Sequence, residues 1–325
     1  MKKGLLLINL GTPLKLTRLH VALFLRAFLL DPYVVTLPYL CRSLLFYLII
    51  LPLRLNKTFN AYKKIWNKRG SPLLFHSQDL ASALQVKLKE KYRVALGMRY
   101  GKPAIKDALL TLATCEEIII LPLYPQYTES VTGSSINFVL KTAKSLNLRA
   151  KLKFINSFYS HKAFINALAS KIKPLINHYD FVLFSYHGLP LKQVNAAGCK
   201  LICPNECDLK KNKACYRAQC FATSKLLTQQ LKIPNFATSF QSRVGTLPWI
   251  EPDTSSMLTY LRHKGIKNIL LVTPSFITDC LETLEEIGIR AKETWHSLGG
   301  KKFSLVASLN ADNAWVEAII KITRL

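Results

Sequence analysis

The sequence predicts an α/β protein with two similar lobes, each built on a parallel sheet. Half of the 325 residues are hydrophobic, and strand-length apolar runs alternate with helix-length segments along the chain. The strand-like runs are almost continuously apolar, which is typical of a parallel sheet that helices cover on both faces. The third observation is an internal repeat. Three segments in the second half resemble three strand ends in the first half, and they occur in the same order.

In each segment of this repeat, an apolar strand leads into polar residues, glycine or proline. The pairs are 5–13 (LLLINLGTP) with 182–190 (VLFSYHGLP), 94–101 (VALGMRYG) with 237–245 (ATSFQSRVG), and 118–128 (IIILPLYPQYT) with 269–279 (ILLVTPSFITD). We therefore predict two domains, residues 1–150 and residues 151–325, with a C-terminal tail that packs on the first. Ligands bind at the carboxyl ends of strands in open α/β sheets, so these polar segments are expected to face one cleft.

The formal charge of +26 comes from 45 Lys and Arg against 19 Asp and Glu. It favours anionic partners such as an acidic membrane or a carboxylate-bearing ligand, although a generally basic proteome would also explain it. The basic residues are scattered and lack the aromatic platforms of nucleic-acid binders, so nucleic acid is not an expected partner. No glycine-rich phosphate loop follows the first strand, which disfavours a nucleotide enzyme.

The segment from Leu19 to Leu55 is strongly apolar, but charged residues such as Asp31 and Arg42 and two prolines interrupt it. No uninterrupted stretch approaches the ~20 apolar residues of a membrane-spanning helix. We expect helices packed on the core, with most residues buried and the rest forming an apolar rim able to touch a membrane. Since the N-terminus lacks the cleavage site of a signal peptide, the chain is expected in the cytoplasm or peripherally on the inner face of the cell membrane.

Two strand ends of the second half carry residues that suit metal and proton chemistry. His187 follows the apolar run FVLFSY, so its imidazole is expected at the sheet edge, where it can accept a proton or bind a transition metal. Gly188 beside it would leave room for a flat ligand. In the segment FITDCLETLEEIG, capped by Thr278 or Asp279, Glu282 and Glu286 lie four apart on one helix face.

The acidic segment holds four of the 19 acidic residues within eight positions, which indicates a cationic substrate. Acidic residues also complement the dipole of a helix start, and that ordinary explanation stays open. In the first half, hydroxyls near Tyr124 and Ser134 at a helix start would suit a carboxylate, although simple capping explains Ser134 equally well. Arg99, Tyr100 and Trp249 would supply stacking and carboxylate contacts to a flat ligand.

Several segments together resemble the ferrochelatase family over nearly the whole chain. They are LINLGTP, DPYVVTLP, AYKKIW, GSPLLFHS, MRYGKPAI, LPLYPQYTESVTGSS, FSYHGLP, FQSRVGTLPW and TPSFITDCLETLEEI. The resemblance implies two Rossmann-like lobes enclosing a porphyrin cleft. It also implies a lyase of the metal chelatase type, which inserts Fe²⁺ into protoporphyrin IX in haem biosynthesis. Coproporphyrin ferrochelatase and a cobalt chelatase of the same fold are the alternatives, and the latter typically has paired histidines where this chain has Glu282.

The resemblance makes His187 and Glu282 a metal-insertion pair that contacts the iron, with Glu286 one turn behind Glu282. The chemistry of insertion then suggests that His187 accepts pyrrole protons while Glu282 and Glu286 guide Fe²⁺ or carry protons away, and the reverse assignment stays open. The implied porphyrin contacts are Arg99, Tyr100, Tyr124, Ser134 and Trp249.

Five of the eight cysteines lie between positions 199 and 220, in the spacing C-x3-C-x3-C-x7-C-x4-C. The last, Cys220, matches a family segment, whereas the four before it are additions. Four thiolates within 17 residues suit a tetrahedral metal or an iron–sulfur cluster. Some bacterial ferrochelatases hold a [2Fe–2S] cluster, and the resemblance therefore implies one here, with structural zinc and free thiols or disulfides as alternatives. The ligands would be Cys199, Cys203, Cys207 and Cys215.

Overall fold

Two four-stranded parallel sheets organise the computed structural model, which describes residues 3–196, 198, 214–243, 245 and 247–325. The first sheet has the strand order β2-β1-β3-β4 and the second has the order β6-β5-β7-β8. In both sheets the first strand of the sheet lies between the second and the third, so the two topologies are the same. This repetition confirms the predicted α/β class with two similar parallel sheets.

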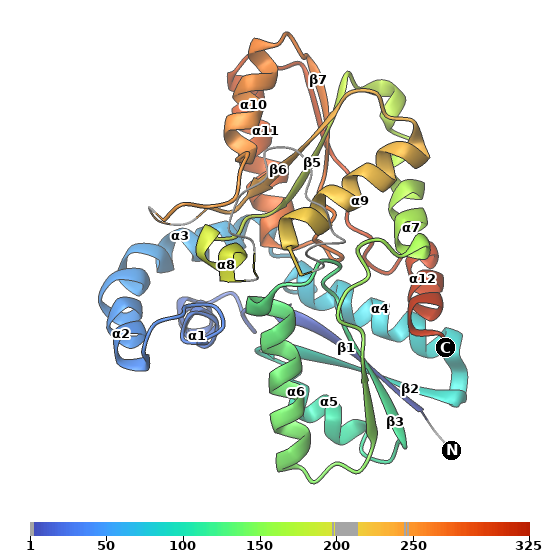
Figure 1. The fold of residues 1–325 in the computed structure, drawn as a ribbon. Helices are drawn as coiled ribbons and strands as arrows, with labels where there is room; N and C mark the ends of the chain where they lie inside the picture. Colours follow the sequence, from blue (N-terminus) through green and yellow to red (C-terminus); the bar gives the residue numbers. More distant parts are fainter. Residues whose placement is uncertain (1–2, 197, 199–213, 244, 246) are drawn as a thin grey trace. The chain divides into compact units, whose positions relative to one another are not determined.

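The described chain divides into two compact units, Met1–Tyr124 with Thr128–Asn156 (unit 1), and Pro125–Tyr127 with Ser157–Leu325 (unit 2). The strands of unit 1 are β1 (Lys3–Gly11), β2 (Tyr92–Tyr100), β3 (Glu117–Pro122) and β4 (Lys151–Phe154). Its helical segments are α1 (Arg18–Leu29), α2 (Tyr39–Leu44), η1 (Leu45–Ile50), α3 (Leu51–Ile65), α4 (Pro72–Leu88), η2 (Lys89–Lys91), α5 (Ile105–Thr111), η3 (Glu129–Gly133) and α6 (Ser134–Ser145) (Figure 1).

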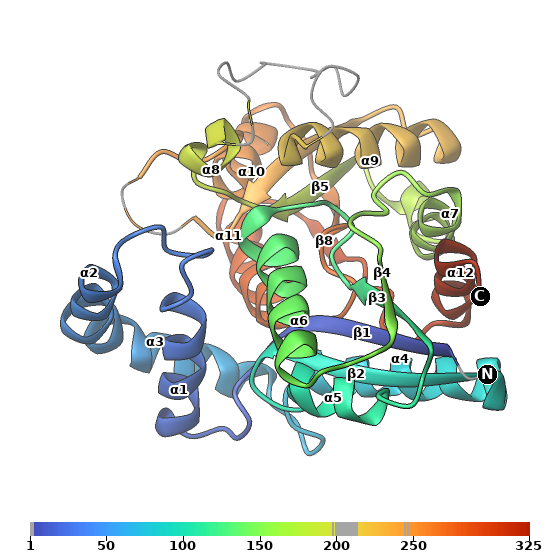
Figure 2. The ribbon, with the colours of Figure 1, turned by 60° about the horizontal axis from the view of Figure 1, so that its bottom comes forward.

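Unit 2 repeats the pattern of strands joined by helices (Figure 2). Its strands are β5 (Phe181–His187), β6 (Phe236–Gln241), β7 (Asn268–Val272) and β8 (Lys302–Leu305). Its helical segments are α7 (Lys162–Ile172), η4 (Ile176–His178), α8 (Leu191–Ala196), α9 (Tyr216–Leu231), α10 (Thr254–His263), η5 (Glu282–Ala291), α11 (Lys292–Ser297) and α12 (Asn313–Thr323).

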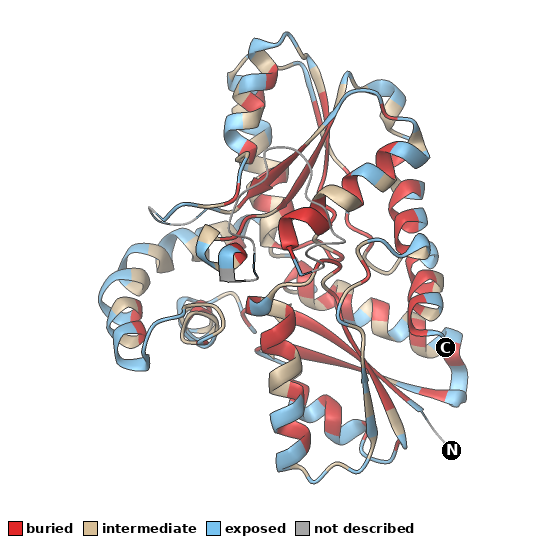
Figure 3. Ribbon diagram, viewed as in Figure 1, coloured by how far each residue is buried: buried red, intermediate tan, exposed pale blue. Residues whose placement is uncertain are grey.

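The apolar strands form the cores of the units, and they are drawn mostly as buried in Figure 3. In unit 1, Leu6 and Ile8 of β1 pack with Leu109 of α5. In unit 2, Leu183 of β5 and Trp295 of α11 belong to one buried cluster. The central strands β1, β3, β5 and β7 are buried along most of their length. A strand covered on both faces favours apolar residues, so polar site residues are expected mainly at its ends.

The C-terminal helix α12 packs against α7 within unit 2, where the Trp315 ring lies 5.9 Å from that of Phe164 and 5.6 Å from that of Phe158. The expected packing of the C-terminal tail on the first lobe stays a prediction.

The apolar segment after α1 differs from its prediction in two ways. Residues Tyr39–Ile65 form one continuous helical stretch through α2, η1 and α3, so Pro52 does not break it. The six residues before Leu51 form a π-helix, in which the hydrogen-bond pattern differs from that of an α-helix. This change lies next to Pro52, which has no backbone N–H to donate. Among the residues that the structure describes, this is the one helix long and apolar enough to cross a membrane.

The prediction that most of this segment is buried was wrong. Only 11% of the most apolar 18-residue window of Tyr39–Ile65 is buried. The physical reason is that α1, α2 and α3 stand to one side of the sheet of unit 1, as Figures 1 and 2 show, and pack mainly on one another. A helix that contacts the core along a narrow stripe leaves its other faces exposed whatever their hydropathy.

Candidate active site

His187 is the last residue of β5, as predicted from the apolar run before it. Its Nδ1 lies 2.6 Å from the carbonyl oxygen of Gly188. A carbonyl oxygen can only accept a hydrogen bond, so Nδ1 is the donor. In the neutral imidazole this leaves the lone pair on Nε2, the atom that is then able to accept a proton or bind a metal ion. The hydroxyl of Tyr216 donates to the backbone carbonyl of His187 at 2.8 Å and fixes this strand end.

Gly188 does not leave its space to a flat ligand, contrary to the prediction. A Cβ at this position would lie 2.7 Å from the carbonyl oxygen of Gln241 and 3.2 Å from the ring of Trp249. The missing side chain therefore lets β6 and Trp249 approach β5 closely. Trp249 remains half-buried beside this strand end, and its contact with a porphyrin stays a prediction.

The acidic segment lies at the start of the π-helix η5 (Glu282–Ala291), and its four acids have two different roles. Asp279 is buried and accepts hydrogen bonds from the backbone N–H of Ser308 and from the side chain of Asn310, so it anchors a loop and does not cap the helix as predicted. Glu285 is also buried and accepts from Arg290 at 2.8 Å. Only Glu282 and Glu286 therefore remain as candidates for contact with a substrate.

Glu286 is close enough to Glu282 and to His187 for both to act on its pKa. Burial raises the pKa of Glu286 above its ordinary value, and this outweighs the hydrogen bonds from Ser242, which lower it. The charge of Glu282 raises the pKa further, and His187 lowers it. A carboxyl with a raised pKa that interacts with a second carboxyl and an imidazole is an arrangement typical of proton-transfer sites. Unit 2 thus brings the three predicted catalytic residues together.

The predicted carboxylate-binding residues of unit 1 converge on a carboxylate of the protein itself. Arg99 Nη2, the Tyr100 hydroxyl and the Ser134 hydroxyl lie 2.5, 2.6 and 2.7 Å from Oδ2 of Asp31. Burial and the hydrogen bond to Asp31 raise the pKa of Tyr100. These donors therefore hold Asp31, and their predicted contact with porphyrin carboxylates stays a prediction.

Asp31 was missed as a site residue because it was taken only as an interruption of an apolar segment. A charged residue inside such a segment needs a partner if it is buried, and this rule could have suggested a role for it. The remaining predicted porphyrin contact, Tyr124, has a buried hydroxyl without a hydrogen-bond partner among the described residues. Burial also raises the pKa of this phenol.

The predicted cluster ligands Cys199, Cys203 and Cys207 lie outside the described residues. Cys215 is described, and its thiol is free and buried at the residue before α9. Within the described ranges, no group of three or more His, Cys, Asp or Glu side chains is placed to hold a metal ion. The predicted iron contacts of His187 and Glu282 and the predicted cluster accordingly stay predictions.

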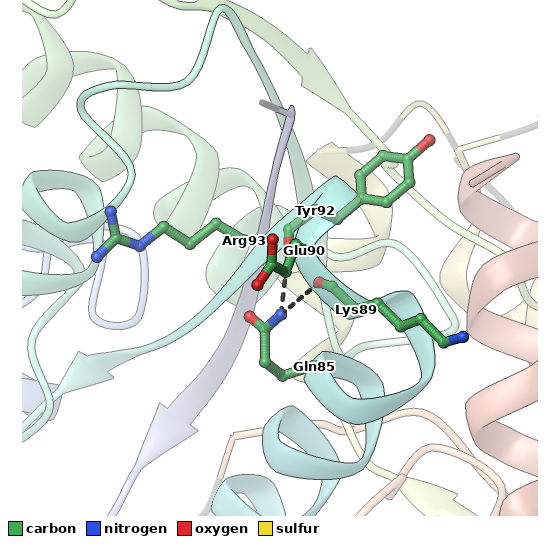
Figure 4. A pocket seen from close by; sticks show the side chains of 5 residues that line it. All are labelled: Gln85, Lys89, Glu90, Tyr92 and Arg93. Atoms are coloured by element: carbon green, nitrogen blue, oxygen red, sulfur yellow. Dashed lines mark hydrogen bonds between the residues drawn. The ribbon is translucent and has the colours of Figure 1, made fainter. Parts of the chain in front are cut away.

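A surface pocket of about 360 Å³ in unit 1 is not part of this site. It lies where β2 begins, at the opposite end of the strand from Arg99 and Tyr100, and its lining is shown in Figure 4. The amide nitrogen of Gln85 donates to the backbone carbonyls of Lys89 and Tyr92. The charged ends of Lys89 and Arg93 point away from each other in the figure, so these two cations do not converge on one ligand.

Comparisons with known proteins agree with the resemblance seen in the sequence. The family model described as Ferrochelatase matches residues 2–325. The chain is 48% identical to a ferrochelatase of Legionella pneumophila (strain Paris), with 99% of this chain and 98% of that protein covered. It is 44% identical to a ferrochelatase of Coxiella burnetii (strain Dugway 5J108-111), with 99% and 93% covered.

Solved structures of chelatases share the fold. The sirohydrochlorin chelatase SirB from Bacillus subtilis subspecies spizizenii, in complex with cobalt, aligns with a TM-score of 0.55 at 10% identity and covers 100% of this chain and 94% of its own. SirB from Bacillus subtilis with Fe³⁺ aligns with a TM-score of 0.58, also at 10% identity, with 100% and 95% covered. Identity this low extends the likeness to the fold alone. With a family match over nearly every residue and relatives at 44–48% identity, the chain belongs to the ferrochelatase family.

Proposed function

We propose that the chain is a ferrochelatase, a lyase of haem biosynthesis that inserts Fe²⁺ into protoporphyrin IX to give protohaem. The observation that best supports the chemistry is the arrangement of His187, Glu282 and Glu286 at the carboxyl ends of the strands of unit 2. Binding and catalytic groups concentrate at that edge in open α/β sheets. The whole-length family match supports the substrate pair of a porphyrin and Fe²⁺.

Metal insertion releases two pyrrole protons and requires that the hydrated ion lose its water. In the proposed site, Nε2 of His187 has the free lone pair and accepts a pyrrole proton, since Nδ1 is used on Gly188. The carboxylates of Glu282 and Glu286 attract the cation and carry the second proton away. Porphyrin binding to Arg99, Tyr100, Tyr124, Ser134 and Trp249 is part of the proposal. Three of these residues, Arg99, Tyr100 and Ser134, also donate hydrogen bonds to Asp31.

The test is a fluorimetric assay of porphyrin loss with Fe²⁺ or Zn²⁺. General acid–base catalysis contributes roughly 100-fold or more, so His187→Ala should lower kcat by about that factor. Glu282→Ala should raise KM for the metal more than KM for the porphyrin. His263→Ala, an exposed histidine at the end of α10, is the matched control and should behave as wild type. Wild-type turnover in a folded His187→Ala variant would overturn the proposed mechanism.

The same assay separates the alternative substrates. Protoporphyrin IX with Fe²⁺ should be turned over faster than coproporphyrin with Fe²⁺ or any porphyrin with Co²⁺. The exposed apolar helices of unit 1 favour the less charged protoporphyrin, which partitions into membranes. Preference for coproporphyrin would replace the proposed substrate and leave the catalytic residues unchanged.

Peripheral contact with the inner face of the cell membrane is a second part of the proposal. Large apolar side chains of α1, α2, η1 and α3 are exposed, including Leu19, Leu40, Leu48, Ile49 and Leu53. Four basic residues, Arg54, Lys57, Lys63 and Lys64, follow on α3. An apolar surface with adjacent Lys and Arg is typical of helices that lie in a membrane interface and attract anionic lipids. We therefore propose that these helices lie on the membrane and do not span it.

The cysteine-rich insert is proposed to hold a [2Fe–2S] cluster, with structural zinc as the alternative. The support is the donor set, since four added thiols within 17 residues match the ligands that both groups prefer. Cys215, the described member, is free and buried, which suits a ligand shielded from solvent. Cys199, Cys203 and Cys207 would supply the other three thiolates. The proposed catalytic chemistry does not pass through this group.

A further inference from the structure

The end of β6 lies between the strand that carries His187 and the helix that carries the two glutamates. Gln241 is the last residue of β6 and is paired in register with His187 of β5. The residue after it, Ser242, has a φ of 66°, a left-handed conformation that is uncommon for a residue other than glycine. Such a conformation persists where surrounding contacts fix it, and Ser242 has such contacts with Glu286.

Ser242 donates two hydrogen bonds to the carboxylate of Glu286. Its backbone N–H donates to Oε1 at 2.8 Å, and its hydroxyl donates to Oε2 at 2.6 Å. Each oxygen of the carboxylate thus receives one donor from the same residue, which fixes both the position and the plane of the group. A carboxylate has about four lone-pair sites, so this contact leaves roughly two free for a proton or a cation.

Gln241 fixes the beginning of the same helix. Its amide nitrogen donates to the backbone carbonyl of Glu282 at 3.1 Å, and its amide oxygen accepts from the hydroxyl of Ser185 at 2.8 Å. Ser185 lies two residues before His187 on β5, and the backbone N–H of Gly188 donates to the carbonyl of Gln241 at 2.7 Å. Gln241 is 2% exposed, so these bonds are protected from water. The two consecutive residues therefore connect His187, Glu282 and Glu286.

We propose that Ser242 is a positioning residue that orients the Glu286 carboxylate toward Glu282 and His187, with Gln241 holding the first turn of η5 beside it. In this left-handed backbone conformation, the N–H and the hydroxyl of Ser242 both donate to Glu286. Ser242 itself needs no contact with substrate, and its effect passes through Glu286. The inference rests on the proposed function, since it assigns a purpose to the orientation of one proposed catalytic group.

The test compares matched serine variants in the metal-insertion assay. Hydrogen-bond partners of such groups typically contribute roughly 10–100-fold, so Ser242→Ala should lower kcat/KM for the metal by about that factor. KM for the porphyrin should not change. Ser256 of α10 is the control, because its N–H and hydroxyl also both donate to one carboxylate, that of Asp253, at an exposed position. Ser256→Ala should retain wild-type kinetics. If Ser242→Ala does not fold, Ser242→Gly deletes the same hydroxyl while suiting the positive φ.

A double-mutant cycle separates positioning from a general structural effect. On a Glu286→Ala background, the serine substitution should cause little further loss, because the group it orients is already gone. An equal loss on both backgrounds, or wild-type kinetics in Ser242→Ala, would overturn the inference. The Glu286→Ala variant alone tests the proposed function. If it is impaired and Ser242→Ala is not, the inference fails and the proposed function stands.

Discussion

Arg99 and Asp31 form an ion pair that is almost withdrawn from solvent: Nη2 lies 2.5 Å from Oδ2, and the two side chains are 14% and 3% exposed. Tyr100 and Ser134 donate to the same oxygen. The guanidinium of Arg99 also lies over the rings of Tyr100 and Phe138, at 4.6 and 4.4 Å from their centroids. Arg99, which was expected to bind the carboxylate of a ligand, thus binds the carboxylate of Asp31 in the protein itself.

Removal of Asp31 is predicted to destabilise unit 1 strongly. Asp31→Ala leaves the Arg99 charge buried without a partner, and breaking a buried pair in this way typically costs about 3–5 kcal/mol. The free energy of unfolding in urea measures the effect. Arg69 and Asp79 form an Arg–Asp pair with two hydrogen bonds at an exposed position, so Asp79→Ala is the control and should cost much less. Equal costs in the two variants would contradict the prediction.

Glu286 is predicted to make stability depend on pH with a specific sign. Because burial raises its pKa above the ordinary value of 4.5, the folded chain binds this proton more tightly than the unfolded chain. Its contribution is fully present below about pH 4.5 and is lost as the pH rises through the folded pKa. The free energy of unfolding of Glu286→Gln minus that of wild type should therefore increase from about pH 4 to about pH 7.

Asp180 provides a control of opposite sign. Burial by itself would raise its pKa, but hydrogen bonds from Asn268 and from the N–H of Lys267 lower it below the ordinary value. Its contribution is present above the unfolded pKa and is lost as the pH falls through the folded pKa. Relative to wild type, Asp180→Asn should therefore lose stability at neutral pH and recover it in acid. A pH-independent difference for Glu286→Gln would contradict the prediction.

The exposed apolar helices of unit 1 are predicted to bind anionic lipid vesicles. Sedimentation with vesicles of phosphatidylglycerol and phosphatidylcholine should carry the wild-type chain down, and salt should weaken this binding. Leu48→Asp combined with Leu53→Asp should abolish the binding while leaving the fold intact, since these side chains are 69% and 74% exposed. Leu110→Asp, at a 53% exposed position on α5, is the control. Extraction from membranes only by detergent would show that Tyr39–Ile65 spans the membrane.

The cysteine-rich insert is predicted to hold iron and sulfide. Chain purified without oxygen should be reddish and absorb visible light if a [2Fe–2S] cluster is bound, and should be colourless but contain zinc in the alternative case. Cys203→Ala should lower the metal content in either case. Cys41→Ala, an exposed free cysteine of α2, should leave it unchanged. Metal content that survives Cys203→Ala would exclude both groups.

The positions of the strands could be predicted from the sequence because a strand buried on both faces is a nearly continuous run of apolar residues. A parallel strand covered by helices must be apolar along its length, so the runs before Gly11, His187 and Pro274 located the strand ends. The same reasoning placed His187 at the carboxyl end of its strand, and in the structure it is the last residue of β5. The acidic pair Glu282 and Glu286 followed from helical spacing.

The partners of those residues did not follow, because they come from distant parts of the chain. Asp31 is 68 positions from Arg99 and 103 from Ser134, and Ser242 is 44 from Glu286. A local pattern records the period of a helix or strand and contains nothing about which elements meet. The same limit explains why Asp279 was taken for a helix cap, although its side chain holds Asn310 and the N–H of Ser308.

By itself, the sequence determined the α/β class, the repeated sheet and the strand-end histidine, since these depend on local hydropathy and on the geometry of single elements. Only the tertiary structure decided that Asp279 and Glu285 are structural and that Glu286 lies near Glu282 and His187, because burial and hydrogen bonding arise when separate elements pack. It also decided that the helical stretch Tyr39–Ile65 is mostly exposed, since hydropathy measures how costly exposure to water is and does not show which surface is covered.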